Sequence, residues 1–249
     1  MELCIFNKIE DDLCIKGILE KDNVIVLRNI IEFSETEGVT SSAIKEYVAT
    51  RLANDDNILS RLAQAGKFIG DDLYRLAKFD IEQIYKKLFS TQIKYAPSGN
   101  PIGFSNGYVA SIRAITESKS AQELLDLLIE HYRKFGSGIL AKYNAFRYDG
   151  ELIGVSNTDD ITFDSLVGIE YQKQVLIDNT KAFVSGKAAN NVLLFGDRGT
   201  GKSSSVKALL NMFCDDGLRI IEMPKHCIKD IPSLSKVLAE SPNKYIIFL

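Results

Sequence analysis

Apolar side chains recur at three- and four-residue spacings through the first ninety residues. In "IGDDLYRLAKFDIEQIYKKLF", residues 69–89, they follow one helical face: Leu73, Leu76, Ala77, Ile81, Ile84, Tyr85 and Leu88. The segments 23–33 and 41–52 have the same spacing. Because a 3.6-residue period places such residues on one side of a helix, the pattern predicts a helical region whose apolar stripes form a core.

A break follows, and then a further helix. "TQIKYAPSGNPIGFSNG", residues 91–107, contains two prolines and three glycines and predicts a loop or linker. Ser120 and Glu123 have the spacing of a capping box at a helix start, and Gly136 can end that helix. Residues 137–160 predict an irregular connector with a short strand pair around Asp149-Gly150. We therefore place a domain boundary at residue 150.

From residue 161 the pattern changes to alternating strands and helices. It predicts the strand "NVLLF" at 191–195 and a helix at 201–213, followed by a strand at 218–223, a helix at 231–240 and a strand at 244–249. Such alternation is typical of a parallel sheet covered on both faces. The predicted fold class is α/β, with a mainly helical domain over 1–150 and a parallel-sheet domain over 151–249.

The turn "GDRGTGKS", residues 196–203, matches the pattern G-x-x-x-x-G-K-[ST] of a phosphate-binding loop. Gly196, Gly199 and Gly201 permit backbone torsions that turn consecutive amides toward an anion. The helix that opens at Gly201 adds free amides and a positive dipole end. In such a loop Lys202 binds the β- and γ-phosphates and the Ser203 hydroxyl binds Mg²⁺.

The remaining loop residues contribute mainly backbone amides to the predicted nucleotide site. This set consists of Asp197, Arg198, Thr200 and Ser204. The expected cofactors are accordingly ATP and Mg²⁺, with Ser203 as the predicted metal ligand.

The segment before the loop narrows the class of P-loop protein. "ITFDSLVGIEYQKQVLIDNTKAFVSG", residues 161–186, resembles the N-terminal element of AAA+ ATPases through Phe163, Asp164, Leu166, Val167 and Gly168. That resemblance implies that Val167, Gly168 and Ile169 line the pocket for the base. Residues 161–249 also resemble an uncharacterised bacterial group of AAA+ proteins with a helical N-terminal region, whereas residues 1–150 do so only loosely.

The chain also departs from the AAA+ pattern. In that family the strand corresponding to "YIIFL", residues 245–249, ends in an acidic pair that supports Mg²⁺ and orients water, and we expect this pair after Leu249. No catalytic residue is therefore assigned. The family's strand order, 5-1-4-3-2, would also leave 191–195 without neighbours. We expect the 249 residues to be an N-terminal portion that neither hydrolyses ATP nor folds its nucleotide domain stably.

Three functions remain open from the sequence. The first is an AAA+ ATPase that in its full-length form assembles into a homo-oligomer and remodels or docks to a partner, recruited through the helical domain. The second is a nucleotide-dependent switch or adaptor that does not hydrolyse ATP. The third is a small-molecule kinase, which would require a substrate lid instead of the 161–186 segment.

Composition restricts partners and surroundings. The net charge is −3, and neither half has a basic excess, so nucleic-acid binding is not indicated. Four cysteines without CxxC spacing favour reduced thiols. His131 and His226 lie far apart, so histidine spacing predicts no metal site. The start of the chain lacks the features of a signal peptide and no segment has the length of a membrane span, which makes the cytoplasm the expected location.

Overall fold

The computed structural model describes residues 1–39, 42–89, 106–156 and 158–249. Contacts divide the chain into two compact units. The helical unit comprises Met1–Lys142 together with Glu240–Pro242, and the sheet unit comprises Tyr143–Ala239 and Asn243–Leu249. The division lies between Lys142 and Tyr143, so the strand pair that follows belongs to the sheet unit.

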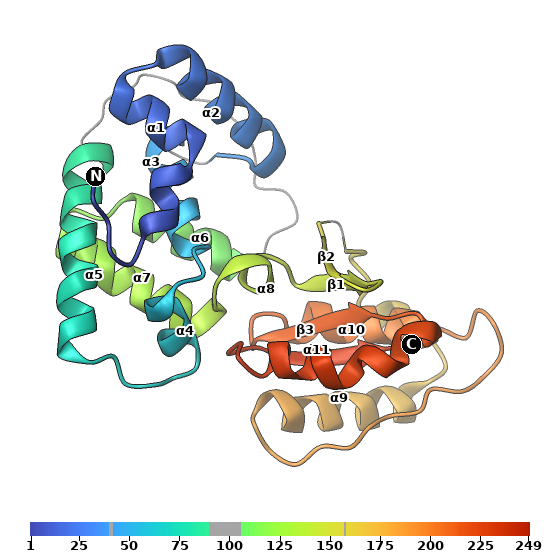
Figure 1. Cartoon of the computed structure of the whole chain (residues 1–249). Helices are drawn as coiled ribbons and strands as arrows, with labels where there is room; N and C mark the ends of the chain where they lie inside the picture. Colours follow the sequence, from blue (N-terminus) through green and yellow to red (C-terminus); the bar gives the residue numbers. More distant parts are fainter. Residues whose placement is uncertain (40–41, 90–105, 157) are drawn as a thin grey trace. The chain divides into compact units, whose positions relative to one another are not determined.

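The helical unit is built from short and medium-length helices (Figure 1). Its elements are η1 (Asn7–Asp11), α1 (Leu13–Glu20), α2 (Asn23–Glu37), α3 (Ala43–Ala53), α4 (Ile58–Gln64), α5 (Asp71–Ile84), the π-helical turn η2 (Tyr85–Phe89), α6 (Asn106–Thr116), α7 (Ala121–Phe135) and α8 (Gly138–Lys142). The helices predicted around 23–33, 41–52, 69–89 and 120–135 are thus confirmed as α2, α3, α5 with η2, and α7. Most of the linker predicted at 91–107 lies outside the described residues.

Helix α7 begins and ends where its capping residues predict. The Ser120 side chain accepts a hydrogen bond from the Glu123 amide at 3.1 Å, and the Glu123 carboxylate accepts one from the Lys119 amide at 2.7 Å. At the other end Gly136 has φ +83° and its amide donates to Tyr132 O. The apolar face between these caps enters a continuous core formed by the helical unit.

The sheet unit contains a four-stranded mixed sheet in the order β2-β1-β3-β4. Its strands are β1 (Ala145–Tyr148), β2 (Leu152–Val155), β3 (Leu218–Glu222) and β4 (Lys244–Phe248). Strand β1 pairs parallel with β3, which pairs parallel with β4, while β1 and β2 form an antiparallel hairpin. The strand pair at Asp149-Gly150 and the strands at 218–223 and 244–249 are confirmed.

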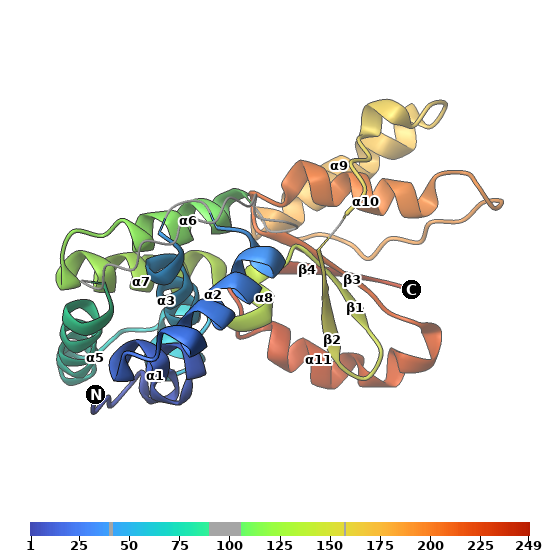
Figure 2. The same cartoon turned by 90° about the horizontal axis from the view of Figure 1, so that it is seen from above.

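Helices cover both faces of this sheet. Figure 2 shows α9 (Glu170–Val184) and α10 (Lys202–Phe213) on one side and α11 (Ile231–Leu238) on the other. Buried side chains of α9, α10 and β3 form one apolar cluster, and α10 shares a second with β1 and β3. Two short turns, η3 (Phe163–Ser165) and η4 (Lys225–Asp230), complete the unit.

The structure corrects two sequence expectations in this unit. The sheet is mixed and not wholly parallel, because the β1–β2 connection is a tight hairpin that forces antiparallel pairing. The strand predicted at 191–195 is wrong: these residues form no strand, and Leu193 and Phe195 are 84% and 89% exposed. A strand requires hydrogen-bonded neighbours, and this segment is not a member of the four-stranded sheet.

Candidate functional site

The three glycines of the loop at 196–203 adopt the backbone torsions that the sequence pattern predicts. Gly196, Gly199 and Gly201 have φ values of +145°, +87° and +81°. L-residues with a β-carbon rarely adopt these torsions, so the loop depends on glycine at all three positions. At Gly196 a β-carbon would also come within 3.2 Å of the Thr200 hydroxyl.

The Lys202 ammonium group folds back over this loop. Its Nζ donates to the carbonyl oxygens of Gly196 at 2.8 Å and Asp197 at 2.7 Å, and it lies 3.4 Å from the Thr200 hydroxyl oxygen. The Thr200 hydroxyl itself donates to Asp197 O at 2.9 Å. The loop therefore forms a small ring of backbone and side-chain contacts around one positive charge.

Helix α10 starts immediately after the loop and has no side-chain cap. Its N-cap is Gly201, and the first bond of the helix runs from the Ser205 amide to Gly201 O at 2.8 Å. The amides of the first helical turn have no carbonyl acceptor within their own helix. Ser203 is exposed in this turn and Ser204 is half-buried. Donors and a positive dipole end are therefore available to an anion.

The segment that precedes α9 is fastened to α10. Asn211 of α10 donates to the carbonyl oxygens of Asp159 at 2.9 Å and Ile161 at 2.8 Å, and Lys207 forms an ion pair with the Asp159 carboxylate. Phe163 is buried in the same apolar cluster as residues of α10. These contacts hold residues 159–163 along the helix that carries the loop.

The same segment reaches the loop itself. A β-carbon on Gly201 would lie 3.5 Å from Leu166 Cδ2, so Leu166 contacts the end of the loop. The next residue, Val167, is 89% exposed; Gly168 has φ +83°, and Ile169 is the half-buried N-cap of α9. The structure thus brings Leu166 against Gly201 at the end of the loop, while Asp197 and Arg198 remain exposed.

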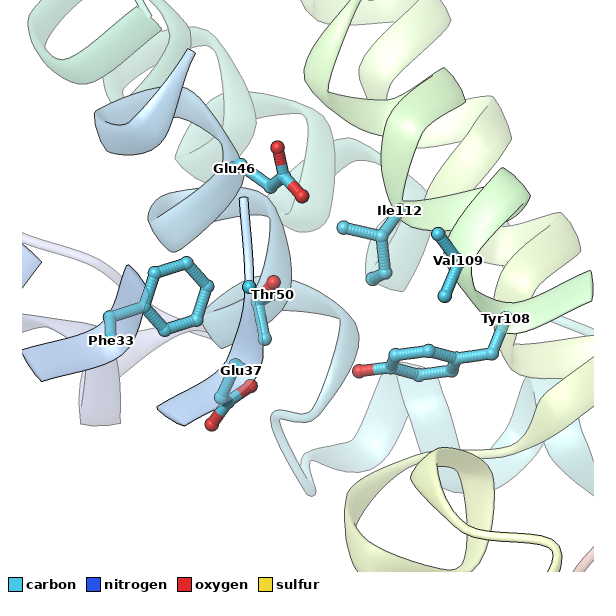
Figure 3. Close-up of a pocket in the computed structure, with 8 residues that line it drawn as sticks. Phe33, Glu37, Glu46, Thr50, Tyr108, Val109 and Ile112 are labelled. Carbon is cyan, nitrogen blue, oxygen red and sulfur yellow. The ribbon is translucent and has the colours of Figure 1, made fainter. Parts of the chain in front are cut away.

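A small hollow in the helical unit, with a volume of about 20 Å³, offers less chemistry (Figure 3). The Asn54 amide donates to the Tyr108 hydroxyl on its wall at 2.8 Å, and Glu37 forms an ion pair with Lys142 at 2.8 Å. The carboxylate of Glu46 also has a partner. Because these polar groups are already engaged, the hollow shows no convergent set of free groups.

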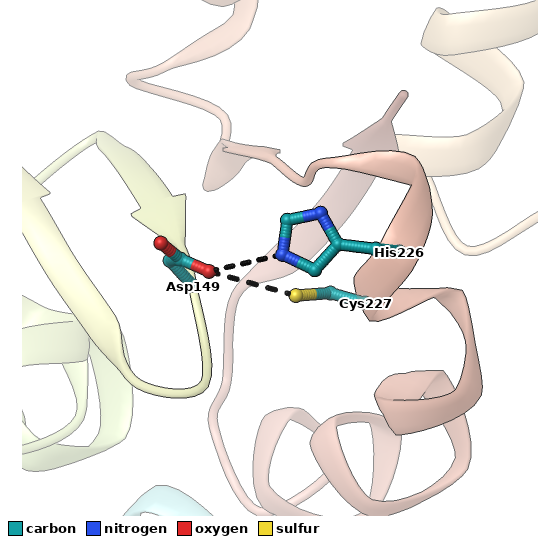
Figure 4. Close-up of side chains that lie close together, drawn as sticks. All are labelled: Asp149, His226 and Cys227. Carbon is teal, nitrogen blue, oxygen red and sulfur yellow. Dashed lines mark hydrogen bonds and ion pairs between the residues drawn. The ribbon is translucent and has the colours of Figure 1, made fainter.

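Sequence spacing missed a second cluster, which lies in the sheet unit. Asp149, His226 and Cys227 place one ligand-type atom each within 4.8 Å of one another (Figure 4). His226 Nε2 is 3.3 Å from Asp149 Oδ1, and Cys227 Sγ is 3.8 Å from the same oxygen. Asp149 and His226 are 77 residues apart, so no local motif could reveal the cluster.

Among the comparisons with known proteins, one family model matches part of the chain. Residues 141–249 match the family model described as "Protein of unknown function (DUF815)". No curated protein and no solved structure matches the chain. The matched region includes both the loop at 196–203 and the Asp149–His226–Cys227 cluster.

Proposed function

We propose that this protein binds ATP with Mg²⁺ through residues 196–203 and is an ATPase of the AAA+ class. The observation that supports the proposal most is the loop itself. Three glycines at positive φ lead into an uncapped helix whose first residue is the only lysine of the loop, already folded over it. This combination supplies hydrogen-bond donors and positive charge to a phosphate group, and α10 carries no acidic side chain that would repel it.

Each part of the loop has a distinct proposed role. The amides of Gly199, Gly201 and the first turn of α10, including Ser204, bind phosphate oxygens, and Lys202 exchanges its carbonyl partners for the β- and γ-phosphates. Ser203 is the proposed protein ligand of Mg²⁺, which neutralises charge on the phosphates when bound.

The base is assigned to the segment that contacts the loop. Val167, Gly168 and Ile169 follow Leu166, which lies against Gly201. Val167, one residue beyond that contact, is exposed and offers apolar surface that the flat face of adenine can cover. This assignment also favours an AAA+ protein over a small-molecule kinase, because the 161–186 segment resembles the AAA+ N-terminal element and its Leu166 lies against the loop.

ATP hydrolysis is proposed to act on a partner recruited by the helical unit. Helix α2 supports this role because several of its large apolar side chains are exposed, namely Val24, Ile25, Leu27 and Ile31. Such a surface is typical of binding between proteins. Among the helices that the structure describes, none is both long and apolar enough to cross a bilayer.

Calorimetric titration of the 249-residue chain with MgATP tests the proposal. Lys202→Ala removes a charge-assisted bond to phosphate and is expected to weaken binding about 10- to 100-fold. Lys236→Ala, which changes an exposed lysine of α11 in the same unit, is the matched control and should bind as the unaltered chain does.

Two results would count against the proposal. One is an absence of measurable ATP binding by a folded chain, and the other is equal affinity of the Lys202→Ala and Lys236→Ala variants. A turnover assay then separates hydrolysis from a switch, since a switch binds ATP without releasing phosphate.

A further inference from the structure

The Asp149–His226–Cys227 cluster lies at the carboxyl ends of two neighbouring parallel strands. Asp149 directly follows β1, and His226 and Cys227 follow β3 in η4. This edge is where open α/β sheets commonly bind ligands. The cluster is made by two elements that the sheet itself brings together.

Local backbone hydrogen bonds fix the two segments that carry these side chains, the β1–β2 turn and η4. Asp149 begins the β1–β2 turn, in which Gly150 has φ +83°, and the Asp149 amide donates to Glu151 O at 3.2 Å. In η4 the Cys227 amide donates to Pro224 O at 2.9 Å. The parallel pairing of β1 with β3 reaches Arg147 and Glu222, so the two elements are linked outside the cluster. Backbone structure therefore brings the three side chains close together without requiring contacts among them.

The two separations from Asp149 Oδ1 are close to those of ligands around one small ion. In a tetrahedral zinc site with bonds of about 2.0 Å to oxygen and nitrogen and about 2.3 Å to sulfur, oxygen and nitrogen lie about 3.3 Å apart and oxygen and sulfur about 3.5 Å apart. The corresponding distances here are 3.3 Å and 3.8 Å. The third pair, His226 Nε2 and Cys227 Sγ, lies within 4.8 Å, whereas such a site has these atoms about 3.5 Å apart, so a rotation of the exposed His226 side chain brings all three atoms around one ion.

We propose that Asp149 Oδ1, His226 Nε2 and Cys227 Sγ bind a divalent transition-metal ion, with Zn²⁺ as the best match. Thiolate, imidazole and carboxylate together suit a borderline-soft ion and not Mg²⁺ or Ca²⁺, which prefer oxygen ligands. Binding releases the Cys227 thiol proton to solvent and uses the Nε2 lone pair of neutral His226, with its proton on Nδ1. Because His226 and Asp149 are largely exposed, a fourth position remains open to water.

The consequence is a metal clamp between the β1–β2 hairpin and η4. An ion at this point ties the turn of the hairpin to the segment after β3, a link across 77 residues of chain. The proposed metal site is separate from the proposed nucleotide site, because none of the metal ligands belongs to residues 161–169 or 196–204.

Cobalt(II) titration of the metal-free 249-residue chain under reducing conditions tests this site. The expected result is one equivalent bound with a thiolate-to-cobalt charge-transfer absorption, which Zn²⁺ then removes by displacement. Cys227→Ser should abolish that absorption, and Asp149→Asn and His226→Gln should each weaken binding at least tenfold. Cys214→Ser, which changes a half-buried cysteine of the same unit, should leave the titration unchanged.

Alkylation followed by mass spectrometry gives a second measurement on the unaltered protein. Zn²⁺ should slow modification of Cys227 and leave the rates of Cys4, Cys14 and Cys214 unchanged. The proposal is overturned if no thiolate absorption develops, if it persists in Cys227→Ser, or if His226→Gln and Asp149→Asn bind cobalt as tightly as the unaltered chain. Far-ultraviolet circular dichroism of each variant verifies that a lost signal is not lost folding.

Discussion

At the scale of single residues, the glycines of the loop show how a motif dictates a backbone. Gly196, Gly199 and Gly201 all adopt positive φ, as the need for close approach to an anion predicts. The neighbouring Lys202 uses carbonyls of the same loop as its partners. Residue identity therefore controls loop shape directly, and this part of the site could be predicted from the sequence.

Ser203 allows the magnesium part of the proposed function to be tested separately from phosphate binding. Ser203→Ala removes the proposed metal ligand and leaves the loop backbone and Lys202 in place. We expect ATP affinity without Mg²⁺ to be unchanged and the additional affinity conferred by Mg²⁺ to be reduced. Calorimetry with and without a chelator measures both quantities, and an unchanged magnesium effect would remove Ser203 from the metal site.

Asp80 is a residue on which the N-terminal segment depends. Its fully buried carboxylate accepts hydrogen bonds from the backbone amides of Cys4, Ile5 and Phe6, at distances from 2.6 to 3.1 Å. Asp80→Ala leaves these donors without that acceptor and should reduce the free energy of unfolding by about 3–5 kcal/mol. Urea unfolding followed by circular dichroism measures the loss, and Asp72→Asn on the exposed side of α5 is the control.

His131 makes the stability of the helical unit dependent on pH. The ring is fully buried, Nδ1 lies 2.9 Å from the Ser111 hydroxyl, and burial lowers its pKa to about 3. Between that value and the unfolded pKa of about 6.5, only the unfolded chain binds the proton, so stability falls as pH falls. From pH 7 to pH 5 this group alone should remove about 2 kcal/mol.

His131→Phe checks this origin of the pH dependence. The substitution keeps a ring against Tyr108 and Phe135 but has nothing to protonate. Unfolding free energies at pH 7 and pH 5 should therefore differ by about 2 kcal/mol less than in the unaltered chain. A difference between pH 7 and pH 5 as large in His131→Phe as in the unaltered chain would contradict the assignment to His131.

At the scale of elements, predictions succeeded where the determinants are local and failed where they are distant. The ends of α7 were predictable because Ser120 and Gly136 act within one turn of the helix. The strand predicted at 191–195 did not form, because a strand also needs a hydrogen-bonded neighbour, and the strand order of the resembled family already implies that this segment has none. The Asp149–His226–Cys227 cluster was missed for the same reason: only the pairing of β1 with β3 brings it together.

The α7 cap offers a test at this scale. Ser120→Ala removes the acceptor for the Glu123 amide and should reduce the free energy of unfolding by about 1 kcal/mol. Thr36→Ala on α2 is a suitable control, since that hydroxyl bonds only to carbonyls of its own helix and should change stability by less than about 0.5 kcal/mol. Equal losses in the two variants would show that Ser120 has no special capping role.

At the scale of the whole molecule, the chain contains two units with separate cores. The large apolar cluster of the helical unit ends at Ala141, and the clusters of the sheet unit begin at Ala145. The family match begins at residue 141, beside the same division. The proposed nucleotide and metal sites both belong to the sheet unit, so we expect ligands to act on its stability and not on that of the helical unit.

Hydrogen exchange of the 249-residue chain, measured by mass spectrometry, tests this separation. A ligand that binds only the folded form stabilises it by about 2.7 kcal/mol at 100 times its dissociation constant. MgATP should therefore slow exchange in peptides from α10 and β3 and leave those from α5 and α7 unchanged. Slowed exchange in both units would mean that their cores are energetically coupled. In Lys202→Ala, MgATP should no longer slow exchange in the peptides from α10 and β3.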